Sequence, residues 1–319
     1  MNLTTLEELD ISPPSDILKR VNVTHFETSF TNRFYNALTV PIDELDKVSE
    51  EDDIWIQGAT VVGWMMSGKT TLSKTLAAIL EDYYSPNFNV QVVIANNVLD
   101  ALLNIESGTE VAVLIVDDAP LGHPSRTRKE MDIINAQAYF AARHIFYRKS
   151  RRAKYVLLFF CTQRYRSLDK NFRLNPILIF KTAFIDPEEN YEIAKMVGRL
   201  YLAALKYIYM MVYEKHKREY LSYSVVKIPS GKEVVVAPPP MNPSRITRVT
   251  LGLEHMIKAQ TESQIKYAIE LLIEGLAKSN VSWYTIQTSL LPSLRRIGVR
   301  INDRRAFKAY QRGCICIDT

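Results

Sequence analysis

Four short apolar runs, interleaved with segments of helical character, constrain the fold of this chain more than any other feature. The runs occupy residues 90–95, 111–118, 155–163 and 176–183. Each is rich in Val, Ile, Leu or Phe at consecutive rather than alternate positions, which is typical of strands buried on both faces. Helices are expected at 97–105, at 129–147 and from 187 to about 220. Buried strands alternating with helices predict an α/β fold in which helices cover both faces of a parallel sheet.

The octet Gly63–Thr70 follows two short extended segments, 53–56 and 59–62, and precedes a helix expected at 71–80. It fills every fixed position of the phosphate-binding pattern G-x-x-x-x-G-K-[ST]. Its glycines let successive backbone N–H groups turn inward, and the positive end of the following helix adds to their field. The sequence therefore predicts a site for ATP and Mg²⁺. The residues expected to bind the nucleotide are Gly63, Trp64, Met65, Met66, Ser67, Gly68, Lys69, Thr70 and Thr71.

Asp117 and Asp118 follow the apolar part of the 111–118 run. Their carboxylates supply the metal-binding and water-activating groups that a phosphate loop alone lacks. We expect Lys69 to reach the β- and γ-phosphates and the Thr70 hydroxyl to ligate Mg²⁺. Asp117 is expected to hold Mg²⁺ through water, and Asp118 to polarise the attacking water. Paired acids at this place favour hydrolysis. The alternative for the pair is an ordinary helix cap or turn.

The 155–163 run ends in Thr162 and Gln163, at the edge of the sheet where ligands bind in open α/β folds. We expect Gln163 to sense the γ-phosphate; the alternative is a solvated strand end. A strongly basic stretch surrounds this strand, with Asp169 its single acid. Its basic residues are Arg143, Arg148, Lys149, Arg151, Arg152, Lys154, Arg164, Arg166, Lys170 and Arg173.

This basic stretch has two interpretations. It is either a solvated charged face or a surface that follows a nucleic-acid phosphate backbone, with Arg148, Arg151 and Arg152 as the candidate DNA contacts. One arginine of the stretch is also expected to reach the γ-phosphate of a neighbouring subunit. Arg173 is the first candidate for that role and Arg143 the second.

Overall composition narrows the class of protein. The chain has 319 residues, 47% of them apolar, and 40 Lys and Arg against 35 Asp and Glu, so its net charge of +5 does not by itself indicate nucleic-acid binding. Three cysteines, Cys161, Cys314 and Cys316, are too few for a disulfide framework and favour a reducing compartment. The first residues lack a secretory signal, and the longest apolar run, 200–213, is shorter than the roughly 20 residues that span a bilayer. We expect a soluble, cytoplasmic protein without a membrane span.

Four regions follow from these patterns: an N-terminal extension (1–50), a phosphate-loop ATPase core (51–220), a hairpin with a proline-rich linker (221–243) and a small helical domain (244–319). The last region is expected to contain helices at 262–278, 283–296 and 303–311. It is either a helix-turn-helix DNA reader or a helical lid or oligomerisation domain. Its late basic residues are Arg295, Arg296, Arg300, Arg304, Arg305 and Lys308.

Several of these motifs together resemble the FtsK–HerA superfamily of DNA-pumping ATPases, and most nearly its viral genome-packaging branch. They are the octet, the Asp117-Asp118 pair, Arg143-His144, the 161–164 segment Cys-Thr-Gln-Arg, and 172–175, Phe-Arg-Leu-Asn, followed by Ile-Leu-Ile-Phe-Lys. The resemblance covers about residues 50–185. It implies a P-loop NTPase fold of the ASCE (RecA-like) type, with the sensor strand between the two nucleotide-motif strands. It also implies an oligomeric ring, usually hexameric, with DNA at its centre and ATP at the subunit interfaces.

The expected function is therefore that of a Mg-dependent ATPase that moves double-stranded DNA as a homo-oligomer. A capsid, a nuclease or another DNA-processing protein is a further expected partner. One alternative is a nucleotide-switched DNA-binding regulator or helicase loader of the AAA+ kind. Others are a conjugation coupling or membrane-associated assembly ATPase, and a small-molecule kinase.

Overall fold

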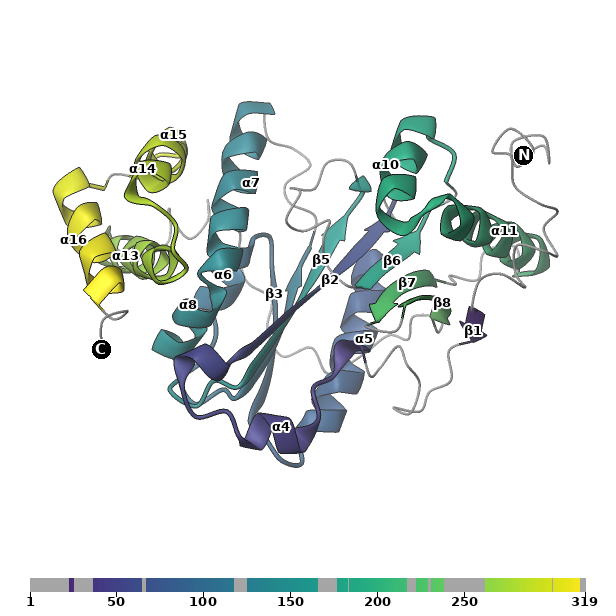
Figure 1. The fold of residues 1–319 in the computed structure, drawn as a ribbon, viewed down its shortest axis with the longest axis horizontal. Coiled ribbons are helices and arrows are strands. Elements are labelled where there is room, and N and C mark those ends of the chain that lie inside the picture. Colours follow the sequence, from purple (N-terminus) through teal and green to yellow (C-terminus); the bar gives the residue numbers. More distant parts are fainter. Residues whose placement is uncertain are drawn as a thin grey trace. The chain divides into compact units, whose positions relative to one another are not determined.

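The computed structural model describes ten stretches of the chain (Figure 1), namely residues 23–25, 37–64, 67–117, 125–165, 177–182, 184–216, 222–228, 231–237, 262–299 and 301–315. The chain divides into two compact units. The first unit comprises Met1–Thr39, Gly58–Leu76 and Phe160–Pro243. The second unit comprises Val40–Gln57, Ala77–Phe159 and Ser244–Thr319.

An eight-stranded sheet has the strand order β1-β8-β7-β6-β2-β5-β4-β3, and its strands β6, β2, β5, β4 and β3 are all parallel. The predicted α/β class and parallel sheet are confirmed, and β5 lies between β2 and β4 as expected. The strands are β1 (Val23–His25), β2 (Trp55–Gly63), β3 (Val90–Ala95), β4 (Val111–Val116), β5 (Tyr155–Thr162), β6 (Ile177–Lys181), β7 (Ser222–Ile228) and β8 (Gly231–Ala237).

Complete burial explains why the apolar runs are uninterrupted. Every residue of β4, β5 and β6 is buried. The register of β3 with β4 runs from Val90 opposite Val111 to Ala95 opposite Val116. The two extended segments predicted before the octet form one nine-residue strand, β2. Strands of this kind must be apolar on both sides because helices cover both faces of a parallel sheet.

Helices connect the strands of the sheet. The described ones up to residue 216 are α4 (Ile42–Asp46), the 3-10 turn η1 (Glu51–Asp53), α5 (Lys69–Tyr84), α6 (Val98–Leu103), α7 (Ser125–Phe140), α8 (Ala142–Lys149), α10 (Pro187–Val197) and α11 (Arg199–His216). Asn97 caps α6 by accepting a hydrogen bond from Asp100 N, and Asp186 caps α10 by accepting from Glu188 N and Glu189 N. The helix starts predicted near these residues are therefore confirmed.

Two predicted helices are each broken in two. The helix expected at 129–147 is interrupted at Ala141, whose φ of −87° and ψ of 2° depart from helical values. The helix expected from residue 187 to about 220 is interrupted at Gly198, whose φ is 96°. A positive φ ends a right-handed helix, and only glycine adopts it without strain.

The predicted hairpin is present and extends the sheet. Strands β7 and β8 pair antiparallel, with Ile228 opposite Gly231. Strand β7 also pairs antiparallel with β6, and β1 pairs parallel with β8. These pairings make the predicted hairpin, residues 222–228 and 231–237, part of the sheet.

The described residues 262–299 and 301–315 of the second unit form four helices and a π-helical turn. They are α13 (Glu262–Lys278), α14 (Trp283–Thr285), the π-helical turn η3 (Ile286–Leu290), α15 (Leu291–Arg296) and α16 (Asp303–Ile315). Helix α13 packs against α7, α8 and α16. A Cβ added at Gly275 would lie 2.7 Å from Ala141 Cβ, and one added at Gly313 would lie 2.4 Å from Glu274 O. Both glycines therefore let helix backbones approach more closely than side chains would allow.

Within the described ranges, none of the helices combines the length and the apolar content needed to cross a bilayer.

Candidate functional site

The predicted phosphate loop joins the end of β2 to the start of α5 in the first unit. Ser67 N donates to Trp64 O at 3.1 Å, which closes a turn. Gly68 has a φ of 82°, and Leu72 N donates to Gly68 O at 2.9 Å as the helix begins. The strand, loop and helix thus follow one another as the motif requires. Met65 and Met66 lie outside the described residues.

Gly63 is required by close contact with β6. A Cβ at this position would lie 2.5 Å from Ser67 Oγ, 2.7 Å from Lys181 O and 2.9 Å from Lys181 Cβ. Any side chain here would displace either the loop or the end of β6. The first glycine of the motif therefore serves packing, whereas the second, Gly68, serves the backbone conformation.

The polar groups of the loop suit an anion. Lys69 is 4% exposed and its Nζ donates to Trp64 O at 3.0 Å. The Ser67 Oγ is buried and, within the part of the chain that the structure describes, has no hydrogen-bond partner. Thr70 lies half-buried in the first turn of α5. A buried hydroxyl without a partner and a buried ammonium at a helix N-terminus fit the oxygens of a phosphate group.

The end of β5 belongs to the same unit. Ser73 Oγ lies 3.1 Å from Cys161 Sγ, which links α5 to β5. The Thr162 hydroxyl donates to Arg164 O at 3.2 Å, so it holds the turn that follows β5. Gln163, the expected γ-phosphate sensor, is half-buried in this turn.

Lys181 is a residue of this region that the sequence analysis did not single out. It is the last residue of β6 and lies opposite Gly63 in the parallel register. Its side chain is 7% exposed, and burial lowers the pKa of its ammonium to about 8. The local signal was a lysine at the end of an apolar strand. The sequence alone did not show that β6 pairs with β2, and this pairing brings Lys181 to the loop.

The remaining expected catalytic residues are placed as follows. Asp117 belongs to the second unit, directly follows β4, is half-buried, and donates its N–H to Ala95 O at 2.9 Å. Asp118 and Arg173 lie outside the described residues, and their roles stay predictions. Across the described ranges, no three His, Cys, Asp or Glu side chains gather into a metal-binding group. Thr70 belongs to the first unit and Asp117 to the second, and their expected roles as Mg²⁺ ligands stay predictions.

The basic stretch separates into structural and exposed side chains. Arg143 Nε donates to Ile54 O at 3.1 Å, and Lys154 Nζ donates to Leu45 O at 2.9 Å. These two residues hold the second unit together. A second group is exposed and, among the described residues, makes no ion pair: Arg148, Arg151 and Arg152. The Arg151 guanidinium lies over the Tyr147 ring, 4.6 Å from its centroid.

Most of the described arginines in the C-terminal helices are paired with acids. Arg295 pairs with Asp303, Arg296 with Glu130 and Arg305 with Glu270. Arg312 pairs with both Glu270 and Glu274. Arg304 and Lys308 are exposed, and Arg300 lies outside the described residues. Much of the charge that would serve a helix-turn-helix reader is therefore already neutralised within the second unit.

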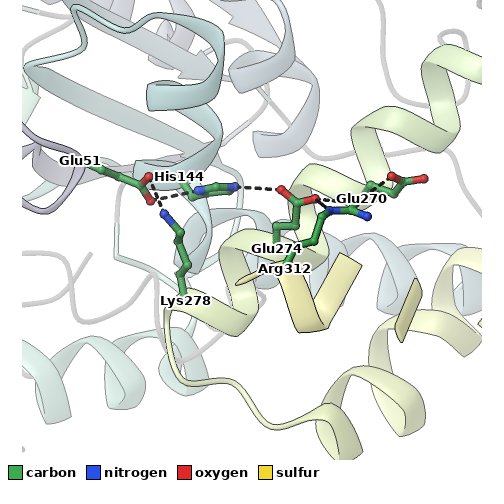
Figure 2. Close-up of polar contacts among 6 residues, drawn as sticks. All are labelled: Glu51, His144, Glu270, Glu274, Lys278 and Arg312. Atoms are coloured by element: carbon green, nitrogen blue, oxygen red, sulfur yellow. Dashed lines mark hydrogen bonds and ion pairs between the residues drawn. The ribbon is translucent and has the colours of Figure 1, made fainter. Parts of the chain in front are cut away.

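A buried polar cluster lies where α13 meets α8 and η1 (Figure 2). His144 is 5% exposed, with Nδ1 at 3.0 Å from Glu51 Oε1 and Nε2 at 3.6 Å from Glu274 Oε2. Lys278 Nζ donates to the other Glu51 oxygen at 2.8 Å. Burial by itself lowers the pKa of His144, but the carboxylates of Glu274 and Glu51 outweigh it, so the pKa is raised.

The pKa values of the two carboxyl groups of the cluster, Glu51 and Glu274, are shifted downward. Burial by itself raises the pKa of Glu51, but His144 and Lys278 outweigh it, and the pKa is lowered. The pKa of Glu274 is lowered in the same way by His144 and Arg312. All these shifts favour the charged forms of His144, Glu51 and Glu274.

Fold and site together define an α/β protein in which a strand, a loop with two glycines and a helix follow one another. Searches of the chain against protein-family models, curated proteins and solved structures found no match.

Proposed function

We propose that this protein is a Mg-dependent ATPase that moves double-stranded DNA and works as a homo-oligomer. The observation that carries the proposal is the loop from Gly63 to Thr70. It combines a glycine that has no room for a side chain, a second glycine at positive φ, a buried lysine and a buried hydroxyl without a partner among the described residues. These are the features of a triphosphate cradle.

Each loop residue has a defined task in this proposal. Lys69 exchanges the Trp64 carbonyl for β- and γ-phosphate oxygens, which raises the number of charge-assisted hydrogen bonds that its ammonium makes. The Ser67 hydroxyl takes a phosphate oxygen as its partner. The Thr70 hydroxyl would ligate Mg²⁺, which would neutralise negative charge on the phosphates. Asp118 acts as general base and Gln163 senses the γ-phosphate.

Exposed arginines supply the DNA contact. Arg148, in the last turn of α8, and the following Arg151 and Arg152 present guanidinium groups to solvent, and phosphate oxygens are their natural partners. They precede the first residue of β5, whereas Gln163 follows its last residue. A single strand therefore connects the proposed DNA contact with the proposed nucleotide sensor.

The test is a steady-state ATPase assay with and without double-stranded DNA. The wild-type chain is expected to hydrolyse ATP only with Mg²⁺, and faster with DNA of any sequence, and this stimulation should weaken steeply with salt. Lys69→Ala should remove hydrolysis in both conditions while the circular dichroism spectrum is unchanged. Stimulation by one DNA sequence alone would favour the regulator instead, and activity in Lys69→Ala would contradict the ATPase assignment.

A further inference from the structure

Lys181 and the phosphate loop approach one another from neighbouring strands of the first unit. Register partners in a parallel pair project their side chains from the same face of the sheet. Since Lys181 is the partner of Gly63, its side chain leaves β6 on the face where a Gly63 Cβ would stand. The 2.9 Å distance between that point and Lys181 Cβ agrees with this placement.

The unpaired hydroxyl of the loop occupies the same place. Ser67 Oγ lies 2.5 Å from the position of a Gly63 Cβ, and Lys181 Cβ lies 2.9 Å from it, so the two atoms are at most 5.4 Å apart. A lysine side chain that begins here is long enough to bring its ammonium to any anion that the Ser67 hydroxyl binds. Because Gly63 has no side chain, the Ser67 hydroxyl and Lys181 Cβ can approach one another this closely.

Lys181 is buried beside the loop. It is 7% exposed, and burial is the cause of its lowered pKa. A phosphate oxygen bound nearby would favour the charged form of such a buried ammonium. Lys206, in α11, is similarly buried at 8% exposure and its pKa is also lowered. Position beside the loop, rather than burial, distinguishes Lys181.

We propose that Lys181 is a second phosphate-binding lysine: its ammonium binds an oxygen of the terminal phosphates of a nucleoside triphosphate, together with the Ser67 hydroxyl. Lys69 binds the same phosphates from the helix side of the loop. The inference rests on the nucleotide binding proposed above and deepens it. It makes the end of β6 part of the nucleotide site.

The proposal has a pH signature. The pKa of Lys181 is about 8 without ligand, and a bound phosphate raises it. Binding then takes up a proton at pH values above about 8, so affinity is constant below this pH and falls as the pH rises through it. This direction follows from a cation whose pKa is higher in the complex than in the free protein.

The experiment measures Mg-ATP binding to the full chain by calorimetry between pH 7 and 9. Lys181→Met should weaken binding on the order of tenfold to a hundredfold at pH 7, as expected for loss of a hydrogen bond to a charged group. It should also flatten the fall above pH 8. The matched control is Lys206→Met, which removes a buried lysine of the same unit and should leave affinity and pH profile unchanged.

Two controls separate the possible failures. Thermal unfolding without nucleotide should show a cooperative transition for Lys181→Met, so that weaker binding is not due to loss of the fold. If Lys181→Met binds Mg-ATP with the wild-type affinity and pH profile while Lys69→Ala does not bind, this inference is wrong and the proposed function stands. If the wild-type chain binds no triphosphate, both are wrong.

Discussion

His144 Nδ1 lies 3.0 Å from Glu51 Oε1, and this pair ties α8 to the turn that precedes β2. On its other side His144 faces Glu274 of α13. The groups facing this imidazole are thus Glu51 and Lys278, which pair with each other, and Glu274, which pairs with Arg312. One histidine therefore joins three segments that are distant in sequence.

The stability of the second unit should depend on pH through this cluster. Because the pKa of His144 is raised in the fold, its contribution is fully present below its unfolded value of 6.5 and is lost as the pH rises through the folded pKa. Because the pKa values of Glu51 and Glu274 are lowered, theirs is present above the unfolded value of 4.5 and lost as the pH falls through the folded values. We expect the largest contribution between these two unfolded values.

His144→Gln tests this dependence by thermal unfolding across pH 4 to 8. The variant should be destabilised by about 2 kcal/mol where the histidine is charged, the amount typical of hydrogen bonds to charged groups. Above the folded pKa of His144 the difference should shrink. Lys195→Gln is the control, because its pair with Glu192 is exposed and should contribute nothing measurable. A pH-independent difference would show that His144 acts through packing alone.

Gly275→Ala should destabilise the second unit by about 1–3 kcal/mol, because the new methyl group would stand 2.7 Å from Ala141 Cβ and 3.1 Å from His144 Cβ. Chemical denaturation measures the change. Gly298→Ala is the comparison. It has nothing within 4 Å of the added Cβ but a φ of 92°, so its cost of about 1 kcal/mol comes from the backbone alone. Equal costs at the two positions would contradict close packing at Gly275.

The roles proposed at the nucleotide site separate in kinetic measurements. Asp118→Asn should retain Mg-ATP binding but slow turnover by about 10²-fold or more, because it removes a general base. Gln163→Ala should resemble it, whereas Lys69→Ala should fail in catalysis at every ATP concentration. Loss of binding in Asp118→Asn would transfer the metal-binding role from Asp117 to Asp118. Unchanged turnover in Gln163→Ala would make Gln163 an ordinary strand end.

Replacing Arg148, Arg151 and Arg152 together by Ala should lower DNA affinity and flatten the salt dependence by roughly one unit of slope per lost phosphate contact. Hydrolysis without DNA should survive. The comparison variant replaces Arg295, Arg296, Arg304 and Arg305, most of which are held by acids in the second unit. If that variant loses binding to one preferred sequence while the triple variant responds to DNA normally, the C-terminal helices read the DNA.

Strands and helix starts were predictable because local physics determines them. Strand β3 has the bounds expected from its apolar run. Its one polar residue, Gln91, is buried, and its Oε1 accepts hydrogen bonds from Glu106 N and Thr109 Oγ1. The break at Gly198 had a local signal, a glycine inside a helical pattern, which was not used. The break at Ala141 had none, because alanine is the best helix former and the bend accompanies contact with Gly275, far away in sequence.

The candidate site was predictable only in its contiguous part. The residues from Gly63 to Thr70 form a single sequence motif, so they could be recognised without knowledge of the rest of the fold. Lys181 joins it only through the pairing of β6 with β2, which depends on the strand order of the whole sheet. The pairing of Arg296 with Glu130 likewise joins residues that no sequence spacing relates.

Gly275 and Gly313 have a mechanical consequence. Helices usually slide past one another by repacking the flexible side chains between them. Here the backbone of α13 rests against Ala141 on one side, and α16 rests against the Glu274 carbonyl on the other. At these two points no flexible side chain separates the helices, so a displacement of α16 cannot be taken up by side-chain repacking. It would be transmitted through α13 to α8, and Arg148, in the last turn of α8, would move with it.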